Sequence, residues 1–340
     1  MQSTETNAAK GSNTTWDMGT DTTLIHILAR NAELLGNRVA MREKHLGIWQ
    51  ETTWSQMLDT TLACAAGMES LGFGAEDALL VLGDNRPRLY MGMLAAGVLG
   101  GYAMPVYSTA TPDEIRHFMH ETHVRFVLAE DQEQVDKVLD LGDQGATIKN
   151  IIYDEPRGLT NYSNPGLISW EKLQAIGADR LRAEPKLRNA LIERALPDGP
   201  AVFVHSSGTT GKPKGVVLSH RNFLAGVRNA HRGGAFTFGE TILAYLPMAW
   251  VGDFAITVGA GVALHFTINI PERQETVLHD LREVAPTFYL AAPRSWDNML
   301  TTIQVRMEDS TPLKKWFYDV FMNSALASER RKLEGKQPSL

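Results

Sequence analysis

The 340-residue sequence has little of several features that mark specialised classes of protein. Its single cysteine, Cys64, excludes a disulfide within the chain, and a reducing, cytosolic setting fits. The apolar neighbours of Cys64 predict a small core side chain and not a nucleophile. Lysine and arginine total 33 against 39 acidic residues, and no long basic run is present, which argues against nucleic acid as the main partner.

A long uninterrupted apolar run is also missing. The one uncharged stretch of membrane-spanning length, residues 89–112, contains four glycines and two prolines, so it predicts a buried helix followed by a strand. Residues 1–21 are rich in Thr, Asn and Ser and lack apolar periodicity, which predicts a disordered leader without a signal peptide. Peripheral contact with a membrane stays open, because a modest surface patch is enough for it.

From residue 22 onward, short apolar strands alternate with segments whose apolar residues recur at helical spacing. This alternation is typical of an α/β fold, with layered sheets joined by crossover helices. The expected strands are 38–43, 47–53, 78–82, 124–129 and 148–153. The expected helices are 22–35, 57–71, 112–123, 130–142 and 180–195, and a further helix follows a cap at Ser219.

The chain is organised around residues 202–218. Apolar residues 202–204 and 216–218 predict two short buried strands, and glycines, hydroxyl-bearing residues and lysines lie between them. Glycine lets backbone N–H groups approach a ligand, hydroxyl groups donate hydrogen bonds, and lysine adds mobile positive charge, so this set suits a triphosphate. The candidate phosphate-binding residues are Ser206, Ser207, Gly208, Thr209, Thr210, Gly211, Lys212, Lys214 and Gly215.

Two other interpretations of this stretch compete. A Walker A loop requires Gly, four further residues and then Gly-Lys-Ser/Thr, whereas here Ser206 stands at the first glycine position and Pro213 follows Lys212. That interpretation therefore fails at both positions. The second is a Ser/Gly-rich surface turn, but turn composition alone does not arrange glycines, hydroxyls and lysines in this order between two strands.

Residues 206–215 resemble the phosphate-binding signature of the adenylate-forming (AMP-dependent synthetase and ligase) superfamily, which includes acyl-CoA synthetases and luciferases. The signature runs from Thr/Ser-Ser-Gly-Thr-Thr-Gly to Pro-Lys-Gly, and His205 precedes it where Tyr or Phe is commoner. The resemblance implies that the loop threonines, Lys212 and backbone N–H groups hold the β- and γ-phosphates of ATP. Lys214 is expected to support the loop.

Later segments are similar to further motifs of this superfamily. In residues 243–253, Trp250 occupies an aromatic position that the resemblance places at the mouth of the acyl pocket, with a core-filling role as the alternative. Residues 287–296 resemble a strand that ends in Pro-Arg and an aromatic residue, and they predict a buried pair for Arg294. Residues 42–50 and the Leu-Pro-Met-Ala-Trp variant look most like bacterial long-chain fatty acyl-CoA synthetases.

The resemblance implies a reaction in two steps. The carboxylate of a fatty acid attacks the α-phosphorus of ATP, pyrophosphate leaves, and the thiol of coenzyme A then takes the acyl group from the acyl adenylate. The implied substrates and cofactors are a long-chain fatty acid, ATP, Mg²⁺ and coenzyme A. An adenylating enzyme of another branch is the alternative. No metal ligand is predicted, since the sequence has no H-E-x-x-H motif and no Cys/His cluster.

Residues 22–340 are expected to form a partial AMP-binding (adenylation) domain, the incomplete large N-terminal domain of an adenylate-forming enzyme. The superfamily's adenine motif and its lid domain with a catalytic lysine do not occur before Leu340. No catalytic residue is therefore assigned, and the polypeptide of residues 1–340 is expected to be inactive alone. A non-catalytic nucleotide- or anion-binding fragment is the alternative. Apolar residues within 316–321 predict a helix face that needs a partner.

Overall fold

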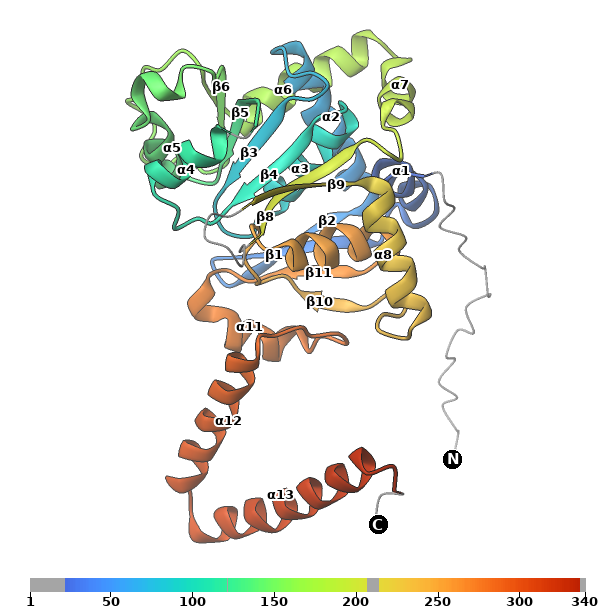
Figure 1. Ribbon diagram of the computed structural model, residues 1–340, viewed down its shortest axis with the longest axis vertical. Coiled ribbons are helices and arrows are strands. Elements are labelled where there is room, and N and C mark those ends of the chain that lie inside the picture. The colour runs from blue at the N-terminus through green and yellow to red at the C-terminus, as the bar shows by residue number, and fades with distance from the viewer. Residues whose placement is uncertain (1–21, 121, 207–213, 337–340) are drawn as a thin grey trace, which may run out of the picture. The chain divides into compact units, whose positions relative to one another are not determined.

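The computed structural model describes residues 22–120, 122–206 and 214–336 (Figure 1). The expected leader, residues 1–21, lies outside the described residues, and so do residues 207–213 of the predicted phosphate loop. The chain divides into two compact units, Met1–Phe288 and Tyr289–Leu340. All of the described strands belong to the first of them.

The first unit contains, within its described residues, a seven-stranded sheet with the order β7-β6-β5-β3-β4-β8-β9. Neighbouring strands are parallel except for β8 and β9, which form an antiparallel hairpin at one edge. The predicted strands 78–82 and 124–129 are confirmed as β3 and β5. The strands are β3 (Ala78–Leu82), β4 (Tyr102–Val106), β5 (Val124–Ala129), β6 (Asn150–Tyr153), β7 (Leu167–Ser169), β8 (Pro200–Ser206) and β9 (Lys214–Ser219).

A second sheet in the same unit has the order β10-β11-β1-β2. The two N-terminal strands form the predicted hairpin, and β1 also pairs in parallel with β11, where Met41 faces Ile268. The sheet therefore joins segments from opposite ends of the unit. Its strands are β1 (Val39–His45), β2 (Ile48–Thr53), β10 (Thr241–Leu243) and β11 (Thr267–Ile270).

Helices cover both faces of the seven-stranded sheet (Figure 1). Buried residues of α4 and α5 pack on one face, whereas those of α1, α2, α3 and α8 pack on the other. The predicted α/β fold with crossover helices is thus confirmed. Its helices are α1 (Leu24–Leu35), α2 (Trp54–Ser70), α3 (Pro87–Val98), α4 (Pro112–Met119), α5 (Gln132–Leu139), α6 (Trp170–Ala183), α7 (Leu187–Arg194), α8 (His220–Arg232), α9 (Val251–Asp253), α10 (Gly261–Ala263) and α11 (Val277–Val284), with 3₁₀ segments η1 (Gly142–Gly145) and η3 (Gln274–Thr276) and the π-helix η2 (Phe254–Ala260).

The core follows from the two-residue repeat of the buried strands. In β3, Leu80 faces the cluster that includes α4 and α5, whereas Leu79 faces the larger cluster that includes Met41 of the second sheet. Cys64 in α2 is fully buried in this larger cluster, which confirms its predicted core position. Burial raises the pKa of the Cys64 thiol, so the thiolate is disfavoured.

Helix starts follow local sequence signals. Thr53 and Gln56 form a reciprocal capping box at α2, and Thr111 and Glu114 form another at α4, where Pro112 is the first helical residue. None of the helices in the described part of the chain is both long and apolar enough to cross a membrane. Residues 89–112 accordingly form α3 and β4, the helix and strand that the sequence predicts.

Three expectations need correction. The single helix predicted at 180–195 is two helices, α6 and α7, because Pro185 between them has no N–H to donate and disfavours helical backbone before it. The strand predicted at 216–218 forms but is not buried: β9 is an edge strand, and the side chain of Val217 is 52% exposed. No strand forms at 287–292, and Arg294 is exposed in a helix instead of lying in a buried pair.

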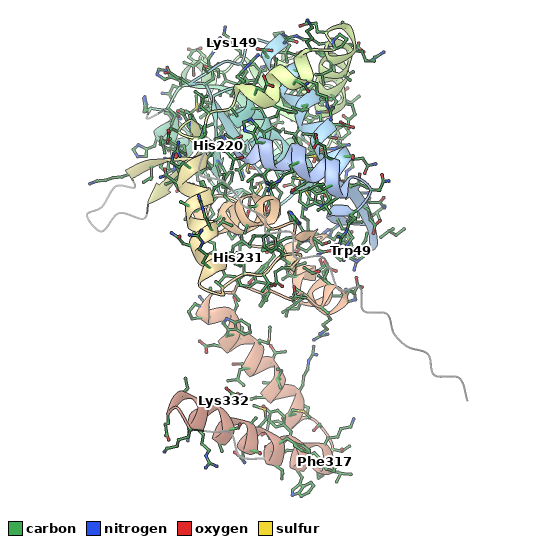
Figure 2. All side chains as sticks on the ribbon, turned by 90° about the vertical axis from the view of Figure 1, so that its right-hand side faces the viewer. Trp49, Lys149, His220, His231, Phe317 and Lys332 are labelled. Carbon is green, nitrogen blue, oxygen red and sulfur yellow. The ribbon has the colours of Figure 1, made fainter. Side chains whose placement is uncertain are left out.

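The second unit consists, in its described residues, of α12 (Pro293–Glu308) and α13 (Pro312–Leu333). No side chain of either helix is buried. Large apolar side chains are exposed along α13, including Trp316, Phe317 and Phe321. Of these, Phe317 is labelled in Figure 2. The apolar face predicted within 316–321 is therefore present and uncovered.

Candidate active site

The predicted phosphate loop connects the two strands of the β8–β9 hairpin. In the antiparallel register His205 faces Gly215, and Ser206 faces Lys214, so the ladder runs up to both ends of the loop. Of the predicted phosphate-binding residues, Ser206, Lys214 and Gly215 are brought together in this way. Ser207, Gly208, Thr209, Thr210, Gly211 and Lys212 lie outside the described residues.

Strand β8 is fixed by burial on the sheet side and by aromatic contacts near its end. It runs parallel to β4, with Val202 opposite Ala103, and therefore delivers the loop at the carboxyl ends of parallel strands, where α/β sheets bind ligands. The imidazole ring of His205 lies 4.0 Å from the ring centre of Phe118 and 5.1 Å from that of Phe203. The imidazole thus makes the packing contacts that an aromatic residue would make.

The far end of the hairpin is fixed by the start of α8. Ser219 caps this helix in a reciprocal box with Asn222. The next residue, His220, is buried at the head of the helix (Figure 2). A Cβ at Gly97 of α3 would lie 3.2 Å from Cε1 of its ring. Burial lowers the pKa of His220 to about 4, so the ring is neutral at pH 7.

Trp250 lies in a loop between β10 and α9. Its backbone N–H donates to the carbonyl of Pro247 at 2.9 Å, and its own carbonyl accepts from the N–H of Asp253 at 2.9 Å. The indole folds over Gly252, where a Cβ would meet ring carbons at 2.3 Å. Trp250 is 41% exposed, so it does not fill the core. Within the described residues, no aromatic contact joins Trp250 to the β8–β9 hairpin.

A buried polar cluster lies at the base of the Trp250 loop. The Tyr90 hydroxyl donates to Asp253 Oδ2 at 2.7 Å, and Thr257 Oγ1 donates to Asp253 Oδ1 at 3.1 Å. The Asn85 side-chain amide donates to the Tyr90 hydroxyl at 2.6 Å and to the carbonyl of Leu246 at 2.9 Å. Sequence reasoning missed this cluster, because Asn85 looks like a turn residue and no local spacing relates it to Asp253.

A polar cavity of about 570 Å³ is a second group of charges that the sequence did not predict. It is lined by residues of β1 and β2 and by side chains that follow β3, β5, β6 and β11. Arg86 Nε lies 2.9 Å from Glu130 and 3.4 Å from Glu43, and Arg88 lies 2.8 Å from Asp154. Burial raises the pKa of Glu43 to about 7. Because carboxylates already neutralise these two arginines, the cavity suits an anion less well than the loop does.

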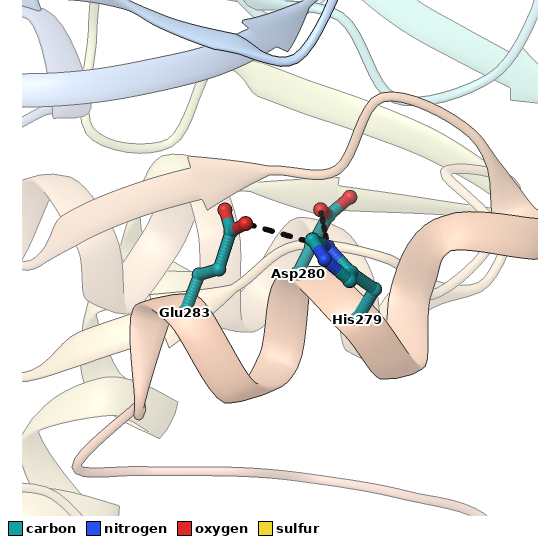
Figure 3. Close-up of side chains that lie close together, drawn as sticks. All are labelled: His279, Asp280 and Glu283. Carbon is teal, nitrogen blue, oxygen red and sulfur yellow. Dashed lines mark hydrogen bonds and ion pairs between the residues drawn. The ribbon is translucent and has the colours of Figure 1, made fainter.

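One described group of side chains has the composition of a metal site. His279, Asp280 and Glu283 of α11 lie with their ligand atoms within 4.8 Å of one another (Figure 3). The Lys44 ammonium group, however, lies 2.8 Å from Asp280 and 2.6 Å from Glu283, and it is itself buried. Lysine thus supplies the cation that these carboxylates need, and the group ties β1 to α11.

Together these features define an α/β protein with a Gly-, hydroxyl- and Lys-rich loop carried by an edge hairpin. The chain belongs to the AMP-binding enzyme family, whose model matches residues 28–331. The resemblance to adenylate-forming enzymes that residues 206–215 carry is thereby confirmed.

Curated relatives extend this finding. The chain is 28% identical over 331 residues to the long-chain-fatty-acid-CoA ligase ACSBG2 of Rattus norvegicus. The matched region covers 94% of this chain and 48% of that protein. It is 24% identical over 324 residues to the ligase of the same name from Xenopus laevis, covering 93% of this chain and 43% of that protein. The chain thus spans about half the length of the curated relatives it matches.

Solved structures share the fold. A luciferase-like enzyme of the mealworm Zophobas morio matches with a TM-score of 0.66 at 18% identity, over 80% of this chain and 60% of that one. The N-terminal domain of FACL13 from Mycobacterium tuberculosis matches with a TM-score of 0.57 at 21% identity, over 76% of this chain and 60% of that one. At these identities the likeness shows the fold alone.

Proposed function

We propose that this chain supplies the phosphate-binding and acyl-side parts of an enzyme that activates long-chain fatty acids. ATP and the fatty acid give an acyl adenylate and pyrophosphate, and coenzyme A then takes the acyl group. The observation that carries the proposal is the β8–β9 hairpin, which closes the Gly-, hydroxyl- and Lys-rich loop between Ser206 and Lys214. The family match and the names of the relatives support the same chemistry.

The loop residues would act by holding charge. Thr209, Thr210, Lys212 and backbone N–H groups would donate to the β- and γ-phosphates and stabilise the departing pyrophosphate. Lys214 begins β9 opposite Ser206, a place from which it would support the loop. The donor set is made of hydroxyls, N–H groups and ammonium groups, which fits a polyphosphate. Mg²⁺, when bound with ATP, would shield the phosphate charge.

The acyl side would lie at the loop that carries Trp250. Its exposed indole would contact the fatty acid at the mouth of the acyl pocket. The names of the two vertebrate relatives favour a long acyl chain over the acids used by other adenylating branches. Reduced, buried Cys64 supports a cytosolic setting, and a peripheral membrane contact would give access to the fatty acid.

Residues 22–340 would form part of the AMP-binding domain. For the polypeptide of residues 1–340 by itself we expect nucleotide binding with little or no turnover, because the adenine motif and the lid lysine are not in its sequence. This makes nucleotide binding without catalysis the second candidate function of that polypeptide.

Two assays on purified protein separate these functions. The first measures equilibrium ATP binding, which Lys212→Ala should weaken by about tenfold or more because it removes a charge-assisted contact, whereas Lys172→Ala, an exposed lysine of α6, should leave it unchanged. The second measures fatty-acid-dependent exchange of pyrophosphate into ATP and coenzyme A-dependent turnover. Steady turnover by residues 1–340 would contradict the expected inactivity, and absence of ATP binding would contradict the proposed function.

A further inference from the structure

The loop that carries Trp250 is held at both ends by one side chain. The Asn85 amide donates to the carbonyl of Leu246 at 2.9 Å and lies 3.4 Å from Asp253 Oδ1, so it bridges the first and last residues of the segment 246–253. Asn85 follows β3 and comes from a distant part of the chain. The base of the loop is therefore set by a tertiary contact and not by its own sequence.

The cluster around this amide is buried and satisfied. Asp253 is 1% exposed and Tyr90 is fully buried. Both carboxylate oxygens of Asp253 accept a hydrogen bond, from Tyr90 at 2.7 Å and from Thr257 at 3.1 Å. A buried carboxyl group with fixed donors is strongly directional, because moving it would leave several polar groups without partners in a low-dielectric surrounding. Such a cluster positions the backbone that carries it.

The same cluster is continuous with the helix that follows the phosphate hairpin. Asp253 precedes the π-helix η2, a rare conformation that occurs often at functional sites. The first residue of η2, Phe254, packs with its ring centre 4.8 Å from that of Phe223 in α8. Through this contact, the base of the Trp250 loop rests on α8, the helix that begins where the hairpin ends.

We propose that Asn85, Tyr90 and Asp253 are positioning residues that hold the loop 246–253, and with it Trp250, in the place required for binding the fatty acid. This inference rests on the proposed function. The three residues act through the loop and need not touch the substrate. Their loss should therefore weaken fatty-acid binding selectively and leave ATP binding unchanged.

The first test reads the position of Trp250 without any ligand. Tyr90→Phe removes one hydroxyl, and Asp253→Asn keeps an acceptor oxygen while it removes the charge. Comparing each variant with the same variant carrying Trp250→Phe isolates the emission of this residue among seven tryptophans. Acrylamide should quench Trp250 more strongly in Tyr90→Phe than in the unaltered protein, because the loop loses its anchor.

A matched control exists elsewhere in the first unit. The Tyr162 hydroxyl donates to Asp136 at 2.6 Å and accepts from the Gln132 side-chain amide at 2.9 Å, which are the same kinds of partner. Tyr162→Phe should leave the quenching of Trp250 unchanged. If Tyr90→Phe behaves like Tyr162→Phe in this measurement, the proposal is overturned.

The second test measures palmitate and ATP affinity in the same variants. Tyr90→Phe should weaken palmitate binding by about tenfold and leave ATP affinity unchanged. Asp253→Asn should weaken palmitate binding less than Tyr90→Phe does. Gly252→Ala displaces the indole directly and leaves the cluster intact, so it should reproduce the palmitate effect even where a cluster variant does not fold. Equal palmitate affinity in Gly252→Ala and the unaltered protein would contradict the role of the loop.

The two tests separate two failures. If the unaltered protein binds neither ATP nor palmitate, the proposed function is wrong, while the quenching result still decides whether the cluster anchors the loop. If ATP binds and Trp250 is anchored but palmitate affinity does not respond to Tyr90→Phe, the proposed function stands and the positioning role is overturned.

Discussion

The phosphate hairpin and the Trp250 loop reach their positions by different means. The hairpin is built by local pairing, since its register joins residues that are near neighbours in the sequence, such as Ser206 and Lys214. The loop 246–253 is set by Asn85 and Tyr90, which precede it by more than 150 residues. The hairpin thus depends mainly on its own composition, whereas the loop depends on a buried contact that only the folded chain makes.

The largest expected effect removes the buried contact at the loop. Asp253→Ala should lower the free energy of unfolding by about 3–5 kcal/mol, because it leaves the Tyr90 hydroxyl and the Asn85 amide short of buried partners. Urea denaturation measures this loss. On the hairpin, Val217→Thr changes a half-exposed residue of the edge strand and should alter the free energy of unfolding by no more than about 0.5 kcal/mol. Equal effects at the two places would remove the difference between loop and hairpin.

A pH titration sharpens the same comparison. Burial raises the pKa of Asp253 to about 7, well above the ordinary value of an aspartate. The folded protein then keeps a proton that the unfolded chain releases near pH 4, so this group's contribution to stability is complete below pH 4, falls as the pH rises toward 7, and levels off above 7. A tenfold difference in proton affinity between the folded and unfolded chains corresponds to roughly 1.4 kcal/mol of stability.

Asp253→Asn carries no titrating group at this position and is the control for the titration. The difference in unfolding free energy between the unaltered protein and Asp253→Asn should therefore decrease between pH 4 and pH 7. Because Glu43 has a raised pKa in both proteins, its contribution cancels in that difference. A difference that stays constant across this range would show that Asp253 is ionised throughout it.

At the hairpin, the ring of His205 gives a smaller effect. His205→Ala should lower the free energy of unfolding by about 1–2 kcal/mol, because it removes the ring contacts with Phe118 and Phe203. His205→Tyr should retain most of this energy, since it keeps an aromatic ring beside Phe118. Thermal denaturation of the two variants compares them directly, and equal losses would mean that ring packing is not what His205 provides.

Apart from the near-neutral Val217→Thr, the smallest effect concerns the helix cap at the end of the hairpin. Ser219→Ala removes the side chain that accepts from the N–H of Asn222 and should cost about 1 kcal/mol. Ser219→Asp keeps an acceptor at the helix start and should lose much less. If both substitutions are neutral in denaturation experiments, α8 does not depend on this cap.

Sequence alone predicted the parts of this fold that local patterns determine. The apolar run 78–82 and the helix cap at Ser219 predicted β3 and the start of α8 where they are observed, since these signals act within a few residues. The helix expected at 180–195 is divided at Pro185 into the end of α6 and the whole of α7, because proline has no N–H to donate. The exposure of β9 depends on its place at the sheet edge, which no property of 216–218 reveals.

The candidate site divides in the same way. The loop between Ser206 and Lys214 could be found from composition and spacing, because a polyphosphate site needs many donors in one short stretch. The cluster at Asn85 and Asp253 could not, because its members come together only when β3, α3 and the segment after β10 have packed. Trp250 lies between these cases: the sequence marks the residue, and its exposure appears only in the structure.

The most direct measurement determines ATP and palmitate affinities for Lys212→Ala and Tyr90→Phe side by side. We expect a crossed result, in which Lys212→Ala weakens only ATP binding and Tyr90→Phe weakens only palmitate binding. If each substitution weakens the binding of both ligands equally, the loop and the hairpin are not separate parts of the site. Unchanged ATP affinity in Lys212→Ala together with unchanged palmitate affinity in Tyr90→Phe would contradict the proposed roles of both.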